Sequence, residues 1–162
     1  MIQRLQSILL LVAVLCNLGV LAAPLWMYQF GNGREVVNGL AVTAEQSDAG
    51  PQEISFTENP FHLAFFSLVV IASAWLFLSI FQYHNRKRQM KWGYVGLVAL
   101  LLEVLSLVLF TNNGPFLLGG SSGGIEVQWG FALPVLALVL VWWAIRRIKA
   151  DEELVRSVDR IR

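Results

Sequence analysis

The chain has 162 residues, of which 56% are hydrophobic and 14% are charged, and its formal net charge is +1. Soluble domains carry about 25% charged residues, so the composition favours a single-domain integral membrane protein and disfavours a soluble or nucleic-acid-binding one. One cysteine excludes an intrachain disulfide, and two widely separated histidines without ligand-like neighbours indicate no metal site.

Four apolar segments are long enough to cross a bilayer, which requires about 20 apolar residues per helix. They cover residues of about 5–27, 61–83, 92–111 and 128–145. Aromatic residues mark their ends, as expected at headgroup depth. Because none of the four has a polar face, core helices of a soluble bundle are disfavoured. We predict a mainly α integral membrane protein, a four-transmembrane-helix bundle that forms one domain over residues 1–162.

The first segment has an alternative interpretation as a cleaved signal peptide. Arg4 would be its basic region, and Ala22 and Ala23 would lie at the cleavage site. The apolar stretch is long for such a peptide, and Pro24 fits poorly after one of the candidate bonds. We therefore expect the segment to be retained as a helix.

Basic residues are distributed unevenly between the two sides of the predicted crossings. Every Lys and Arg except Arg34 falls before the first segment, in the short link after the second, or after the fourth. Because basic residues concentrate on the cytoplasmic side of membrane proteins, we predict that both termini are cytoplasmic.

The two outer loops, residues 28–60 and 112–127, are polar and rich in turn residues. β-Branched residues at 35–42, 53–57 and 125–128 predict a small extracytoplasmic β-ribbon or sheet, although disorder near residues 47–50 is the alternative. The glycine-rich stretch 114–124 lacks the Lys-Ser/Thr ending of a nucleotide-binding loop. We interpret it as a connector.

Glu103 lies in the middle of the third apolar segment, where an ionisable residue indicates a functional site. Matching depths across the predicted crossings places four residues in one buried polar layer: Glu103, Asn17, Ser73 and Ser106. No membrane segment contains Lys or Arg. Since burial disfavours the charged form of a carboxyl, we expect a neutral Glu103. The layer either joins the helices or holds a protonatable group for ion or solute coupling; a cationic partner from another subunit or ligand is the third alternative.

Residues 146–162 follow the fourth segment with no Gly or Pro between them and favour helix. Acidic residues precede basic ones at helical spacing, as Glu152 and Arg156 do. We expect a cytoplasmic helical extension whose narrow apolar stripe binds a protein partner, a second copy or lipid headgroups. A solvated helix without a partner is the alternative.

The two ends of the chain carry the most specific motifs. MIQRLQ at residues 1–6 and the tail KADEELVRSVDRIR resemble a family of small bacterial four-helix membrane proteins, domain of unknown function family 4293. The resemblance implies a multi-pass location in the cytoplasmic (inner) membrane of a bacterium. The matching tail residues include Lys149, Asp151, Leu154 and Ser157, with Ala150 inserted. Because both ends are predicted to lie on one face, we expect a cytoplasmic interaction surface formed by Gln3, Arg4, Asp151, Glu152, Arg156, Asp159 and Arg160.

The sequence contains no HExxH motif, no paired intramembrane acids and no nucleotide-binding loop. We therefore predict no catalytic residues and no cofactor. The favoured function is a non-enzymatic integral membrane module, such as a small subunit, scaffold or assembly factor. The alternative is a transporter or ion-coupled membrane protein that uses Glu103.

Overall fold

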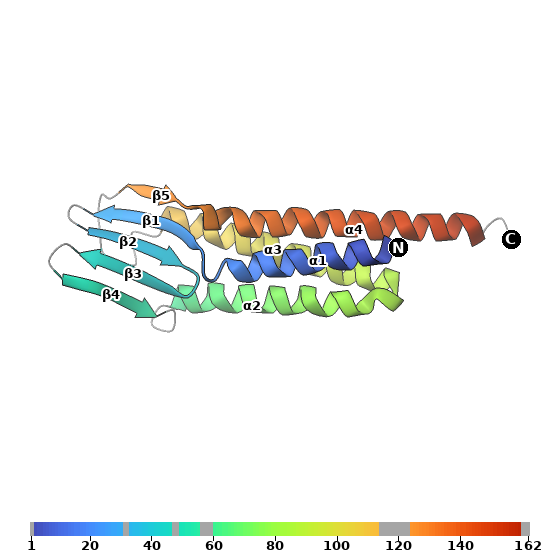
Figure 1. Ribbon diagram of the computed structural model, residues 1–162, viewed down its shortest axis with the longest axis horizontal. Helices are drawn as coiled ribbons and strands as arrows, with labels where there is room; N and C mark the ends of the chain where they lie inside the picture. The colour runs from blue at the N-terminus through green and yellow to red at the C-terminus, as the bar shows by residue number, and fades with distance from the viewer. Residues whose placement is uncertain (1, 31–32, 47–48, 56–59, 114–123, 160–162) are drawn as a thin grey trace.

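The computed structural model describes residues 2–30, 33–46, 49–55, 60–113 and 124–159 of the chain. Long helices lie side by side, and a β-sheet extends from one end of them (Figure 1). The N-terminal end of the first helix and the C-terminal end of the last both lie away from the sheet. The predicted mainly helical fold with a small antiparallel sheet is therefore confirmed.

The described residues form four α-helices and two short 3-10 helices. These are α1 (Ile2–Gly19), α2 (Pro60–Ile80), η1 (Phe81–His84), α3 (Arg86–Asn113), η3 (Trp129–Phe131) and α4 (Ala132–Asp159). α1 packs on α2 and α4, and α3 packs on the same two helices. Consecutive helices run in opposite directions along the long axis (Figure 1).

Within the described residues, three helical segments are long and apolar enough to cross a membrane: His62–Tyr83, Arg86–Leu109 and Trp129–Val155. The apolar part of α1, Leu5–Gly19, is shorter. α3 begins at Arg86, several residues before the predicted start near residue 92, and α4 continues without interruption through the predicted tail to Asp159.

The prediction of a first helix over residues 5–27 is wrong at its C-terminal end. α1 stops at Gly19, and the amides of Leu21 and Ala22 donate to the carbonyls of Leu18 and Gly19 in a tight turn. Pro24 follows and cannot continue a helix, because its nitrogen has no hydrogen to donate and its ring clashes with the preceding turn. The remaining residues of the segment begin a strand instead.

Five strands form one antiparallel sheet in the order β4-β3-β2-β1-β5. They are β1 (Pro24–Phe30), β2 (Gly33–Asn38), β3 (Ala41–Gln46), β4 (Ala49–Ser55) and β5 (Ile125–Val127). The predicted strand at 35–42 divides into β2 and β3, because the Asn38 side-chain oxygen accepts hydrogen bonds from the Leu40 and Ala41 amides and closes a turn. Most of the glycine-rich connector, residues 114–123, lies outside the described residues.

One face of the sheet packs against the ends of the helices. Trp26, Val37 and Val42 lie opposite one another on three adjacent strands, and all three are buried in a cluster with Leu107 of α3. Phe65 of α2 packs against the same cluster. The sheet and the helices therefore share an apolar core at their junction.

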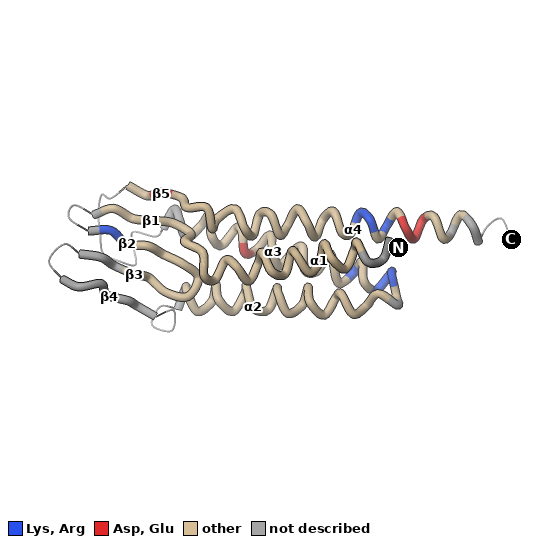
Figure 2. The backbone as a smooth tube through the Cα atoms, viewed as in Figure 1, with Lys and Arg blue, Asp and Glu red and all other residues tan. Residues whose placement is uncertain are grey.

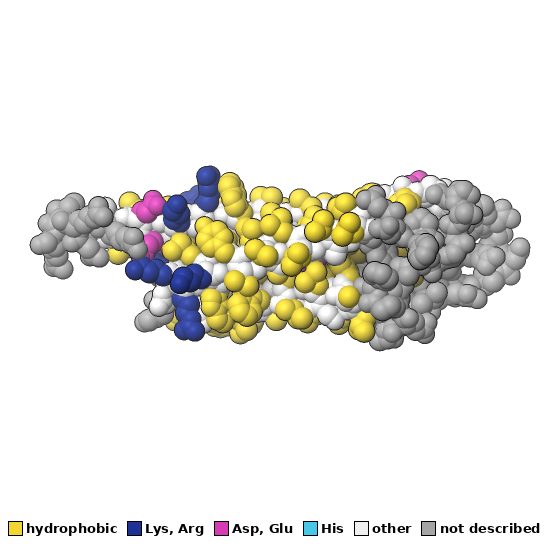
Figure 3. Space-filling model, turned by 180° about the vertical axis from the view of Figure 1, so that it is seen from behind, with side chains coloured by type: hydrophobic (Ala, Val, Ile, Leu, Met, Phe, Trp, Pro, Cys, Tyr) yellow, Lys and Arg dark blue, Asp and Glu magenta, His cyan; other side chains and the backbone are white. Residues whose placement is uncertain are grey.

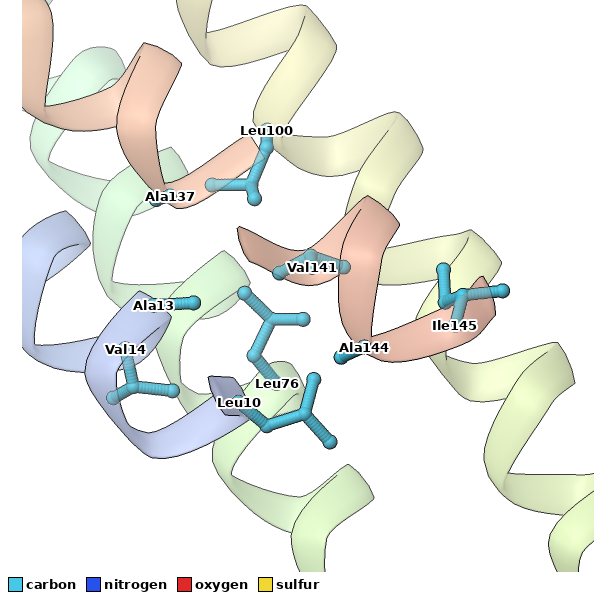
Figure 4. Close-up of a cluster of buried hydrophobic side chains, with 9 residues drawn as sticks. All are labelled: Leu10, Ala13, Val14, Leu76, Leu100, Ala137, Val141, Ala144 and Ile145. Carbon is cyan, nitrogen blue, oxygen red and sulfur yellow. The ribbon is translucent and has the colours of Figure 1, made fainter. Parts of the chain in front are cut away.

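A second core lies between the helices (Figure 4). It is built from Leu10, Ala13, Val14, Leu76, Leu100, Ala137, Val141, Ala144 and Ile145. Two glycines let the backbones approach: a Cβ on Gly96 would overlap the Leu76 side chain, and one on Gly93 would lie 2.9 Å from Ile145. Small residues at such contacts are typical of helices that pack in membranes.

The outward faces of the helices are also apolar. Leu15, Ile71 and Leu102 are each more than half exposed, and hydrophobic side chains cover the middle of the molecule (Figure 3). A band of Lys and Arg side chains borders this apolar belt at the end away from the sheet (Figure 3). Apolar surface of this extent on all helices indicates a membrane protein.

Candidate functional site in the helical core and at its basic end

A buried polar layer crosses three helices between the two apolar cores. Asn17 of α1 and Glu103 of α3 have no exposed surface, and Ser73 of α2 is 3% exposed. The Asn17 side-chain amide donates to the Ser73 hydroxyl at 3.0 Å and to the Val69 carbonyl at 3.4 Å. The structure thus brings together two of the residues that depth matching placed at one level.

Ser106 belongs to the predicted layer by position but not by contact. Its hydroxyl donates to the carbonyl of Glu103, one turn earlier in the same helix, at 2.7 Å. Such a bond satisfies a serine hydroxyl inside an apolar helix without a partner on another helix. Ser106 therefore shares the face of α3 that carries Glu103, and its hydroxyl is used locally.

The Glu103 carboxyl lies beside Asn17, whose side chain interacts with it. Within the described part of the chain, no donor forms a hydrogen bond with either carboxyl oxygen of Glu103. The Asn17 side-chain oxygen also accepts no hydrogen bond. Buried polar atoms are rarely left in this condition. A proton on Glu103 would supply a donor, because a neutral carboxyl has an O–H whereas a carboxylate only accepts.

At the basic end, the predicted tail contacts the α2–α3 link. Arg86 lies 3.4 Å from the Asp151 carboxylate and donates to the Asp151 carbonyl at the same distance. The sequence suggested contacts of Gln3 or Arg4 with the tail acids instead. The side chains of Gln3 and Arg4 lie outside the described part of the structure, as do those of Arg156 and Asp159 and the whole of Arg160.

Two tryptophans from neighbouring helices stack near the same end. Trp75 of α2 stacks on Trp92 of α3 with ring centroids 4.6 Å apart, and its indole N–H donates to the Trp92 carbonyl. Trp92, Trp142 and Trp143 fit the prediction that aromatic residues mark the ends of the apolar segments, whereas Trp75 lies inside the segment predicted over residues 61–83.

The sheet has its own pair of titratable residues, of which Tyr28 is buried and Glu35 is partly exposed. Tyr28 and Glu35 lie opposite each other on β1 and β2. Burial raises the pKa of Glu35. Burial, followed by the nearby Glu35 charge, raises the pKa of Tyr28. Burial on the side of the sheet that faces the helices thus disfavours the charged form of each side chain.

A family described as domain of unknown function DUF4293 matches residues 2–161 of the chain. The chain belongs to the DUF4293 family. The match confirms the resemblance of the two ends and extends it over the sheet and all four helices. A comparison with curated proteins finds no match to the chain.

Membership in DUF4293 assigns no activity, so the chemistry of the site has to come from its geometry. Among the described residues, no three His, Cys, Asp or Glu side chains gather as metal ligands would. The polar layer offers one carboxyl, one amide and one hydroxyl enclosed by apolar helices. This set can fix how the helices pack and can hold or release a proton.

Proposed function

We propose that this DUF4293 chain is a non-enzymatic integral membrane module, a small subunit, scaffold or assembly factor of the bacterial inner membrane. The observation that supports the proposal is the division of the surface along the long axis. An apolar belt (Figure 3) lies between a band of cations at one end of the helices and the β-sheet at the other (Figure 2). Such a division suits a protein whose two ends meet different aqueous compartments.

The position of the cations supports an orientation with both termini in the cytoplasm. Of the described Lys and Arg side chains, only Arg34 lies in the sheet; the others lie at the opposite end of the helices (Figure 2). Positive residues close to membrane-spanning helices remain on the cytoplasmic side. The sheet would then be extracytoplasmic.

α1 completes four crossings in this proposal although it is short. Its 18 residues span about 27 Å, close to the hydrocarbon thickness of about 30 Å. Its outward side chains Leu11, Leu15 and Leu18 are apolar and exposed. β1 would leave the bilayer directly at the end of α1, with its backbone paired on both sides by β2 and β5.

α4 offers a surface for a protein partner or for self-association. It extends past the N-terminal end of α1 (Figure 1), and its exposed side chains there include Leu154 and Val155. The Arg86–Asp151 ion pair ties the base of this extension to α3. A module that presents a fixed helix beyond the membrane suits an assembly role.

Cysteine accessibility tests the orientation. Cys16 is the only native cysteine, so a Cys16→Ala background allows single cysteines at Lys87 in the basic band and at Leu40 in the β2–β3 turn. A membrane-impermeant maleimide added to intact cells should label the cysteine at position 40 and not the one at 87, and permeabilised cells should show both. Labelling at 87 from outside would refute the proposal.

A second candidate function, ion coupling through Glu103, is favoured by the donor-poor carboxyl in the polar layer. Glu103→Gln separates the two roles, because glutamine keeps the shape and hydrogen-bonding capacity but cannot release a proton. A joining role predicts near-normal stability for the variant. Ion coupling predicts that proton flux into proteoliposomes, read with an enclosed pH dye, occurs for the unmodified protein and is lost in the variant.

A further inference from the structure

Three arginines at the basic end each lie over the ring of a tryptophan. The guanidinium of Arg146 is 4.5 Å from the ring centroid of Trp142, that of Arg147 is 5.7 Å from Trp143, and that of Arg88 is 5.9 Å from Trp92. All three distances are within the range of cation–π attraction. We call these contacts the Arg–Trp pairs.

The Arg–Trp pairs occupy the border between two kinds of surface. The tryptophans belong to the last turns of the apolar belt, and Trp142 and Trp143 are nearly half exposed. The arginines belong to the band of cations that borders the belt (Figure 3). Lys87, Lys91 and Lys149 are exposed in the same part of α3 and α4.

Acidic side chains lie beyond this band rather than within it. Asp151, Glu152 and Glu153 follow the cations along α4, in the direction of its C-terminal end (Figure 2). Asp151 pairs with Arg86, which is not one of the Arg–Trp pairs. Among the described residues, no ion pair neutralises Arg88, Arg146 or Arg147, so their guanidinium groups can pair with anionic ligands.

We propose that the Arg–Trp pairs bind the phosphate groups of anionic phospholipids, an inference that rests on the proposed membrane function. Each indole lies at the depth where interfacial tryptophans are found and holds its guanidinium in a fixed orientation. A guanidinium presents paired N–H donors that match two phosphate oxygens, which an ammonium group cannot do. Anionic headgroups also attract clustered cations near the bilayer surface.

The test uses the full-length protein reconstituted in phosphatidylcholine vesicles with and without phosphatidylglycerol. After mild detergent extraction, native mass spectrometry gives the ratio of the two lipids that remain bound. The unmodified protein should retain phosphatidylglycerol above its proportion in the vesicle. A variant with Arg88→Lys, Arg146→Lys and Arg147→Lys keeps every charge, and its enrichment should fall by about twofold to fivefold for each pair lost.

Two further variants make the result specific. Arg34→Lys changes an arginine of the sheet and should leave the enrichment unchanged, whereas Trp142→Leu with Trp143→Leu should lower it while retaining the arginines. Enrichment that is absent from the unmodified protein, or that persists in both the lysine and the leucine variants, overturns the inference. Failure of the unmodified protein to float with the vesicles would instead contradict the proposed membrane function.

Discussion

Gly96 is the position where the structure makes its sharpest steric prediction. A methyl group there would overlap the Leu76 side chain. Leu76 has no exposed surface and lies in the helical core with Leu10 and Ala144, so it cannot move aside without displacing other buried side chains. Gly96→Ala should therefore force α2 and α3 apart.

The expected magnitude combines two opposing effects. Overpacking of a well-packed core costs about 1–3 kcal/mol. Alanine favours a helix over glycine by about 1 kcal/mol. The net loss in the free energy of unfolding should be about 1 kcal/mol.

A double-mutant cycle with Leu76→Ala isolates the steric part. Removing the leucine side chain alone should cost about 2–5 kcal/mol because it opens a cavity. In that background the overlap is gone, and Gly96→Ala should become neutral or stabilising by up to about 1 kcal/mol. Equilibrium unfolding in mixed detergent micelles, followed by tryptophan fluorescence, measures all four free energies.

Gly19→Ala is the matched control, because its added methyl would lie 3.5 Å from Leu133, an ordinary contact distance. It should show no steric loss. If Gly96→Ala stabilises the unmodified protein, or destabilises both backgrounds equally, then the close approach of α2 and α3 at Gly96 does not exist as described.

Three further outcomes are expected. Asp151→Asn breaks a partly exposed ion pair with Arg86, so it should cost less than about 1 kcal/mol globally but speed amide hydrogen exchange in the last turns of α4; unchanged exchange would show that the pair does not hold this end. Because the folded-state pKa of Glu35 is raised, its contribution to stability is full below the ordinary value of 4.5 and declines as pH rises through the folded-state value. Thermal melts of the unmodified protein should show this decline and Glu35→Gln should remove it, whereas the same decline in both would exclude Glu35 as its source. Trp75→Phe removes a 3.1 Å hydrogen bond to the Trp92 carbonyl and should lower stability by about 1 kcal/mol, measured by the same unfolding titration, so an unchanged value would count against the bond.

The helices were predictable because long apolar runs with at most one charged residue have few alternatives. β1 was not predicted, because Leu25, Trp26 and Tyr28 continue the apolar run of α1, and a short apolar run fits a buried strand as well as a helix. The decisive signal was Pro24, which lies at the boundary between the two elements.

In the candidate site too, some contacts could be predicted from the sequence and others could not. Depth alone placed Asn17, Ser73 and Glu103 together, because antiparallel helices of similar length share a midpoint. Depth could not predict the contact between Arg86 and Asp151, which depends on how far α3 begins before the membrane edge and how α4 is rotated. Rotation also decides that the Ser106 hydroxyl bonds within its own helix.

The pairing of β1 with β5 constrains the order in which the chain can assemble. β1 follows the first helix, whereas β5 comes shortly before the last helix. Residues 26–28 of β1 can therefore pair only after residues 125–127 have been synthesised. During synthesis, the β1 edge of the sheet therefore stays unpaired until the chain has been made at least as far as Val127. The sheet is therefore completed late, when β5 pairs with β1. A truncated product ending before residue 125 would leave β1 as an unpaired edge strand, which could pair with a neighbouring chain.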